Sequence, residues 1–113
     1  MALKDEKPRI ISALSRIPGL ARALPAWPED WAEIPCIVVS EAANVPAEHR
    51  DDRERITELE YYVRVFANRA EEQARIASEA DDVMQELGYS RTMVWDDDGA
   101  EVRQKVMRYR IYL

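Results

Sequence analysis

Acidic side chains are the most chemically suggestive feature of this 113-residue sequence. Three aspartates, Asp96 to Asp98, stand directly before Gly99 in the segment "VWDDDGAE". Such a cluster can bind a metal ion, supply catalytic acids or reverse the chain in a turn. A calcium loop of the EF-hand type needs a glutamate at its twelfth position, which counting from Asp96 is Met107. An Asp-Gly pair between two alternating segments predicts a hairpin turn instead, with an incidental or interface-bound divalent ion as the alternative.

A second acidic pair, Glu58 and Glu60, alternates along one face of a predicted strand beside Arg64. Paired carboxylates can perform acid/base chemistry when a pocket raises the pKa of one of them. Alternate positions on a solvent-facing strand are commonly charged, however, and cross-strand partners such as Arg108 and Arg110 could neutralise both acids. We therefore expect ion pairs at these positions rather than catalysis.

The other reactive side chains are too few for the common catalytic and metal sites. The segment "EHRDDRER" around His49 contains the "HRD" of protein kinases, but Ile56 stands where the kinase asparagine is required. One histidine and one cysteine cannot form a His/Cys zinc site, "GxSxG" is absent, and the three glycines lie too far apart for a phosphate-binding loop. We expect no enzymatic activity and no cofactor, with Cys36 as a small buried strand residue.

Composition and charge narrow the classes of protein further. The 47% of hydrophobic and 34% of charged residues predict one globular domain over residues 1–113. A net charge of −6 repels phosphate backbones and disfavours direct nucleic-acid binding. The start "MALKDEKPRI" lacks the apolar region of a signal peptide, and no segment approaches the ~18 apolar residues of a membrane span. We expect a protein made in the cytosol without a membrane partner.

Apolar periodicity predicts two helices, at about residues 5–17 and 69–87. Pro8 fits the first turn of the first helix, and Pro18 should end it. Asn68 resembles an N-cap of the second helix, and Gly88 suits its C-terminal end. The intervening connector, residues 18–35, has no regular period and contains two tryptophans. Their indoles are expected to cover the core, with contact to a partner as the alternative.

Four strands are predicted, at about residues 36–41, 55–67, 89–95 and 102–112, with a long exposed loop between the first two. The second strand places Leu59, Tyr61, Val63 and Val65 on its inner face. Its thirteen residues would extend about 40 Å, so one end is expected to project. The expected fold is α+β: a four-stranded, mainly antiparallel sheet with two helices packed on one face, in the order α-β-β-α-β-β.

Three ordered segments make the chain similar to a known family. They are "IPCIVVSEAANVP", "YYVRVFANRAEEQARIASEADDVMQELGYSR" and the terminal "VMRYRIYL". Together they resemble the tail completion or tail terminator proteins of long-tailed bacteriophages and prophages, over about Ile34 to Leu113. The residues from Ile10 to Ile17 correspond to the N-terminal helix of that family by position and pattern. The Pro-rich connector with its tryptophans has no counterpart in the resemblance.

The resemblance implies a structural subunit of the virion, located at the head-proximal end of the tail and in the host cytoplasm during assembly. It implies a homo-oligomeric ring, expected to be a hexamer, that caps the tail tube, provides the head-joining surface and lets DNA pass. Its partners would be other copies of the chain, the tail tube protein and the head-completion or connector protein. The alternatives are a head-completion (neck) protein of the same junction and a small ligand-binding or regulatory domain using Glu58, Glu60, Arg64 and Arg108.

Surplus polar and aromatic side chains on the loop 41–55 and on the outward strand faces suit contacts between subunits. The candidate interface residues are Asn44, His49, Arg53, Glu58, Glu60, Tyr62, Arg64, Phe66, Arg108, Arg110 and Tyr112.

Overall fold

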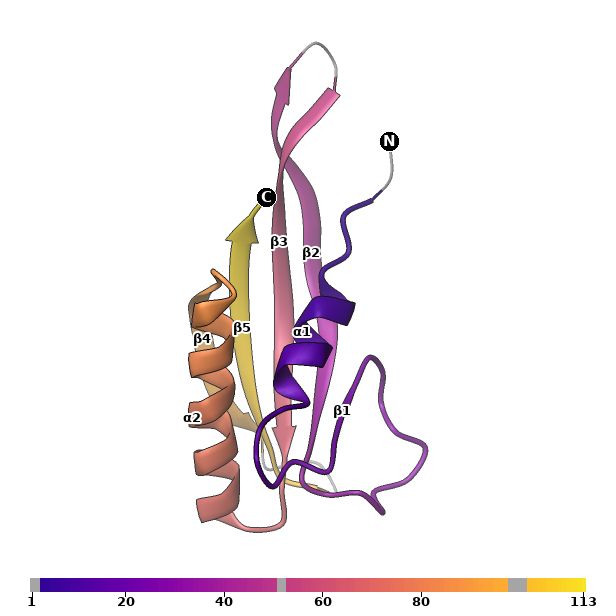
Figure 1. Ribbon diagram of the computed structural model, residues 1–113, viewed down its shortest axis with the longest axis vertical. Helices are drawn as coiled ribbons and strands as arrows, with labels where there is room; N and C mark the ends of the chain where they lie inside the picture. The colour runs from indigo at the N-terminus through magenta and orange to yellow at the C-terminus, as the bar shows by residue number, and fades with distance from the viewer. Residues whose placement is uncertain (1–2, 51–52, 98–101) are drawn as a thin grey trace.

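The computed structural model describes residues 3–50, 53–97 and 102–113. Its elements are α1 (Lys7–Leu14), β1 (Arg22–Leu24), β2 (Cys36–Arg50), β3 (Arg53–Phe66), α2 (Ala70–Glu86), β4 (Ser90–Asp97) and β5 (Gln104–Tyr112). The strands form one mixed sheet in the order β1-β2-β3-β5-β4, and both helices lie on one face of it (Figure 1). The predicted α+β class is confirmed, although the sheet has five strands rather than four.

The additional strand, β1, lies inside the segment predicted as an irregular connector. It pairs parallel to the start of β2, with Arg22 opposite Cys36 and Leu24 opposite Val38. A strand of three residues is too short to produce a visible alternation, and its neighbouring prolines favour the prediction of a loop. The backbone bond from the Ala21 N–H to the Pro35 carbonyl, at 2.8 Å, adds to this pairing.

The most important difference from the prediction is the length of β2. The predicted strand ended near Glu41, before an exposed loop, whereas β2 continues to Arg50 and stays paired with β3 as far as Arg50 opposite Arg53. The sequence "AANVPAEHR" has low strand propensity, but register irregularities around Pro46 and after Glu41 accommodate it beside the strand-forming sequence of β3. Tertiary pairing here overrides local propensity.

The β2–β3 hairpin extends well beyond the rest of the sheet. β5 pairs with β3 only from Glu58 to Phe66, and backbone bonds between Thr57 and Leu113, at 2.6 and 2.9 Å, close that pairing. Beyond this point the two strands continue alone as a ribbon (Figure 1), which gives the molecule its extents of 51 × 27 × 26 Å. The predicted projection of one end of this strand is confirmed.

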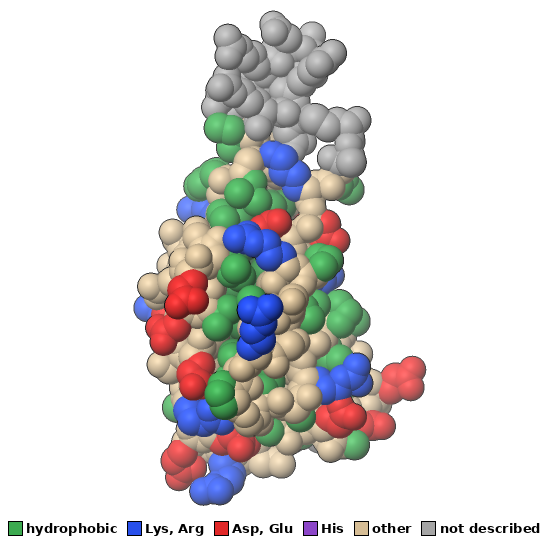
Figure 2. All heavy atoms as spheres, in the orientation of Figure 1, with side chains coloured by type: hydrophobic (Ala, Val, Ile, Leu, Met, Phe, Trp, Pro, Cys, Tyr) green, Lys and Arg blue, Asp and Glu red, His purple; other side chains and the backbone are tan. Residues whose placement is uncertain are grey.

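The core fills the space between the helices and the sheet. The four predicted inward residues of β3 are fully buried, and they pack with Ile10 and Leu14 of α1 and with Ile76, Ala80 and Met84 of α2. The predicted helical stripes therefore cover one face of the sheet as expected. On the surface of this side, acidic and basic side chains of the described residues are interspersed (Figure 2).

The helix ends follow the sequence signals in part. α1 is shorter than predicted, because residues 15–17 form tighter turns before Pro18. Gly88 has φ = 98°, and the Tyr89 N–H bonds to the Met84 carbonyl at 3.0 Å, which is the expected C-terminal motif. At the other end, Arg69 rather than Asn68 occupies the N-cap position and its side chain makes no capping bond, which corrects the predicted cap. In the described part of the chain, no helix has the length and apolar character needed to cross a membrane.

Candidate interaction surface on the outer face of the sheet

The sheet face opposite the helices, here called the outer face, carries most of the predicted interface residues. On β3 they alternate with the core residues, and the register places Glu60 opposite Arg110 and Tyr62 opposite Arg108. Because both β3 and β5 lie in the middle of the sheet, their outward side chains form two adjacent rows. The sheet geometry thus brings together residues that lie about fifty positions apart in the sequence.

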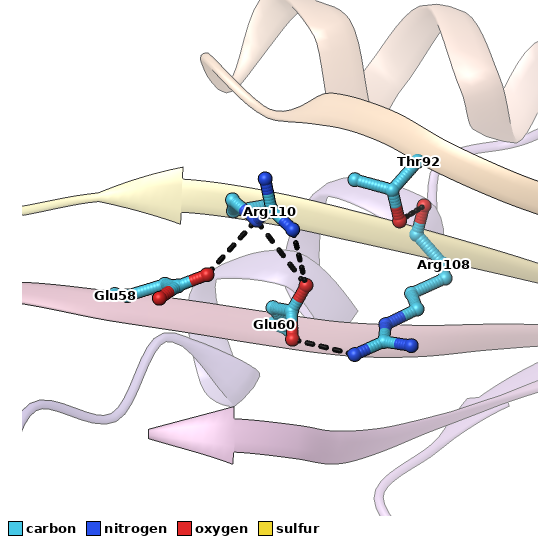
Figure 3. A network of polar contacts seen from close by, with 5 residues as sticks. All are labelled: Glu58, Glu60, Thr92, Arg108 and Arg110. Carbon is cyan, nitrogen blue, oxygen red and sulfur yellow. Dashed lines mark hydrogen bonds and ion pairs between the residues drawn. The ribbon is translucent and has the colours of Figure 1, made fainter. Parts of the chain in front are cut away.

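Glu60 is the centre of an ion-pair network on this face (Figure 3). Its carboxylate accepts hydrogen bonds from Arg108 Nη2 at 2.7 Å and from Arg110 Nε at 3.2 Å, while Arg110 Nε also lies 3.0 Å from Glu58 Oε1. Glu60 is only 4% exposed, whereas both arginines are partly open to solvent. The predicted neutralisation of the two glutamates by the two arginines is confirmed.

The electrostatics of this network keep Glu60 ionised. Burial by itself would raise the pKa of Glu60, but the hydrogen bonds and charges of Arg108 and then of Arg110 outweigh burial and lower the pKa below its ordinary value. The same contact with Glu60 raises the pKa of Arg108. A general acid at neutral pH needs the opposite shift, so this arrangement suits a structural role for the pair.

Aromatic rings separate the charged groups along the same face. The guanidinium carbon of Arg64 lies 5.1 Å from the ring centre of Tyr62, and that of Arg108 lies 5.8 Å from it. Trp95 of β4 contacts Tyr62 edge-on, with ring centres 6.0 Å apart. Cation–π and edge-to-face contacts hold these long side chains against the sheet. The result is an ordered surface of aromatic and arginine groups, the types enriched at protein interfaces.

Phe66 is not part of the open surface. It is fully buried, because Trp31 and Trp27 of the connector lie over it with ring centres 4.6 and 5.3 Å away. The indoles were predicted to cover the core; they cover a small second cluster with Cys36 and Val38 rather than the core on the helix side. The assignment of Phe66 to the outward, accessible face was therefore wrong about its exposure. The connector returns across that face, which strand alternation could not indicate.

The other predicted interface residues have different surroundings. Asn44 donates through Nδ2 to the Lys4 carbonyl at 3.0 Å and to Glu41 Oε1 at 2.9 Å, so it ties the N-terminal segment to β2. Tyr112 is 55% exposed on the outer face. The backbones of His49 and Arg53 belong to the projecting ribbon, but their side chains lie outside the described part of the structure.

The aspartate cluster divides between a strand and a segment that is not described. Asp96 and Asp97 extend β4 beyond its predicted end at Trp95, while residues 98–101, which include Asp98 and Gly99, lie outside the described residues. Asp96 pairs with Lys105 Nζ at 2.7 Å, and Asp97 accepts a bond from Gln104 at 3.2 Å. Among the residues that are described, no group of acidic, histidine or cysteine side chains could hold a metal ion.

Three exposed apolar residues were missed as candidates: Met93 and Trp95 on β4, and Val45 on β2. Their signal in the sequence is the unbroken apolar run "MVW" in a segment predicted as a strand, and the position of Val45 in a segment predicted as a loop. Strand register places all three on the outer face. They enlarge the apolar part of the candidate surface.

Two surface depressions, of about 500 and 240 Å³, lie elsewhere. One follows the connector between Arg22 and Glu33, and the other lies between α1 and α2. Neither is lined by the four residues proposed for a ligand-binding sheet face.

No protein-family model matches this chain, and the comparison with curated proteins likewise finds no match.

Proposed function

We propose that this chain is a tail terminator subunit of a long-tailed bacteriophage or prophage. Copies of it form a ring, expected to be a hexamer, at the head-proximal end of the tail tube. The ring stops tube polymerisation and offers the surface to which the head is joined. The proposal starts from the resemblance of residues 34–113 to that family and is supported by the shape of the molecule.

The observation that carries the proposal is the β2–β3 ribbon. A ring requires a heterologous interface, in which two different patches of neighbouring copies meet. An isolated two-stranded ribbon is marginally stable in water, so a projecting one favours a role in which another surface covers it. The outer face, with Tyr62 and Trp95 held in place by arginines, is a suitable second patch.

The charge of the chain agrees with this role. At a net charge of −6, a ring of such subunits presents an acidic environment that repels the DNA backbone. DNA that passes through the ring would therefore not adhere to it. An enzymatic role is not needed for any of these tasks.

The test measures the molecular mass of the purified chain in solution, alone and with purified tail tube protein, and images the tube ends by electron microscopy. We expect a ring of defined mass on the tube ends and tubes of limited length. A chain that neither assembles nor caps tubes would refute the proposal. Binding to the connector or head-completion protein without any effect on tubes would assign the chain to the neck instead.

A matched pair of variants sharpens this test. Val45 is 44% exposed at the base of the ribbon on the outer face, whereas Val94 is 40% exposed on the edge strand β4 and faces the helix side. A lysine at position 45 places a charge in the proposed ring contact, so Val45→Lys should abolish capping. Val94→Lys makes the same chemical change away from that contact and should leave capping intact.

A further inference from the structure

The edge strand β4 presents an open pairing surface. It is the last strand in the sheet order, and all eight of its residues are exposed. Three consecutive apolar residues, Met93 to Trp95, occupy its centre. A strand edge of this kind presents backbone N–H and C=O groups and readily adds a further strand.

The opposite edge of the sheet has more protective features than β4. Beyond Val38, β2 has no second strand partner among the described residues, but it contains Pro46 and three register irregularities. Proline and bulges are the usual devices that prevent an edge from pairing with another chain. β4 contains neither proline nor lysine and has a single irregularity, at Thr92. β4 is therefore the edge that is suited to strand addition.

We infer that the β4 edge pairs with the β4 edge of a second copy, antiparallel about a two-fold axis through Val94. The sequence of the strand is self-complementary in this orientation. Met93 and Trp95 lie on the outer face, so Met93 of one copy would stand opposite Trp95 of the other. The contact would join the two sheets edge to edge and cover both exposed apolar runs.

The charges of β4 select the antiparallel orientation. Arg91 and Asp96 both lie on the helix side, opposite Tyr109 and Lys105 of β5. With Thr92 bulged in each copy, Arg91 of one copy stands opposite Asp96 of the other, and the two-fold axis produces this pair twice. A parallel arrangement would place like charges together, which destabilises pairing. Arg91 and Asp96 already have intramolecular partners at 3.0 and 2.7 Å but remain 48% and 54% exposed, so each can take a second.

This inference goes beyond the proposed ring, because a two-fold contact closes at two copies and is made along the β4 edge rather than by the ribbon. An eight-residue strand contact falls below the roughly 1,200 Å² of standard interfaces, so the dimer should be weak and dependent on concentration.

The experiment is sedimentation equilibrium of the purified full chain alone, up to roughly 1 mM, where even a millimolar Kd gives a measurable dimer fraction. We expect a monomer–dimer equilibrium. Val94→Lys, which puts a charge on the axis, should weaken dimerisation by at least about tenfold. Val45→Lys, the same change on the protected edge, should leave the dimer unchanged. Tube capping should respond in the opposite way, with loss in Val45→Lys and no change in Val94→Lys. The two variants therefore show which of the two proposals has failed.

Charge reversal gives a second, independent measurement. Arg91→Glu and Asp96→Lys should each weaken the dimer, because each creates two like-charge contacts across the axis. The double variant should restore it. Within one folded copy, the double variant keeps both repulsions of the single variants: the new glutamate at position 91 lies beside Asp81, and the new lysine at position 96 lies beside Lys105. A change inside the monomer therefore cannot explain restored dimerisation. Only a pair between two copies can.

Three results would overturn the inference. The first is a chain that stays monomeric throughout the concentration range. The second is a dimer that Val94→Lys does not affect. The third is a dimer that Val45→Lys abolishes and Val94→Lys does not, which would make the β2 edge, rather than a second β4, the surface that pairs.

Discussion

Tyr61 and Tyr62 are neighbours on β3 but lie on opposite faces of the sheet. Tyr61 is fully buried beneath the helices, and its hydroxyl accepts a bond from the Glu6 N–H at 3.0 Å. Tyr62 is half-buried on the outer face, between two guanidinium groups and the edge of Trp95. The chain thus completes one face of its sheet with its own helices. On the other face it orders arginine and aromatic side chains that remain partly open.

The helix side therefore mainly provides stability, and the outer face mainly provides a surface suited to interaction. On the helix side, burial provides a non-directional hydrophobic contribution. On the outer face, most contacts are charge-assisted or aromatic, and because the arginines stay partly open to solvent, these contacts contribute less to folding than a buried apolar side chain. Substitutions should therefore have graded effects that depend on the face.

The largest effect is expected on the helix side. Leu59→Ala removes a fully buried side chain and should lower the free energy of unfolding by about 3–4 kcal/mol, because transfer and cavity terms add. Urea denaturation followed by circular dichroism measures it. The control is Tyr112→Ala, which removes a larger but 55% exposed group from the outer face and should change stability by about 0.5 kcal/mol or less. Similar losses for both variants would contradict the contrast between the two faces.

Phe66 tests whether the connector makes part of the outer face behave like a core. Phe66→Leu should lower the free energy of unfolding by about 2 kcal/mol, because it loses volume and the contacts with both indoles. Tryptophan fluorescence of the folded protein should shift at the same time, since two of the three tryptophans contact this ring. An unchanged spectrum together with unchanged stability would contradict the described cover.

The Tyr109 hydroxyl tests how much a polar contact on the helix side contributes to stability, compared with a hydroxyl on the surface. The Tyr109 hydroxyl donates to Asp81 Oδ1 at 2.7 Å, and burial followed by this bond raises the pKa of Tyr109. Tyr109→Phe should cost about 1.5 kcal/mol, since Asp81 keeps its contacts with Arg91 and Gln85. Tyr112→Phe is the matched surface variant and should be neutral in the same denaturation measurement. Equal effects would show that the buried bond adds nothing.

The smallest effect is expected for the ion-pair network, and it depends on pH. The pKa of Glu60 is lower in the folded than in the unfolded state, so its contribution is complete above the unfolded value of about 4.3 and is lost as pH falls through the folded value. Glu60→Gln should therefore lower stability at pH 7 and flatten the fall in stability below about pH 4. Denaturation at both pH values measures this change.

Glu79→Gln is its control, because Glu79 pairs with Arg75 at 2.8 Å on an exposed helix surface. That variant should have almost no effect at either pH, as is usual for exposed pairs. If stability fell with decreasing pH in Glu60→Gln as steeply as in the wild type, the pH dependence would come from other carboxylates.

How well the residues of the candidate surface could be predicted depended on whether their surroundings are set by their own strands or by distant segments of the chain. Alternation along β3 and β5 was enough to place Glu60 beside Arg108 and Arg110, because strand period and antiparallel pairing determine which residues can meet. The exposure of Phe66 could not be predicted in the same way, since it depends on where the connector returns. The exposed Met93 and Trp95 required knowledge that β4 is an edge strand.

Local periodicity and backbone preference were sufficient to predict the α+β class, the inward stripe of β3, the helix end at Gly88 and the over-long strand. The three-dimensional arrangement was needed to show that β2 continues past Pro46, that β1 joins the sheet and that the indoles cover Phe66. The physical reason is that such features depend on pairing and burial between distant segments. Their free energy can override weak local propensity but leaves no periodic signal in the segment itself.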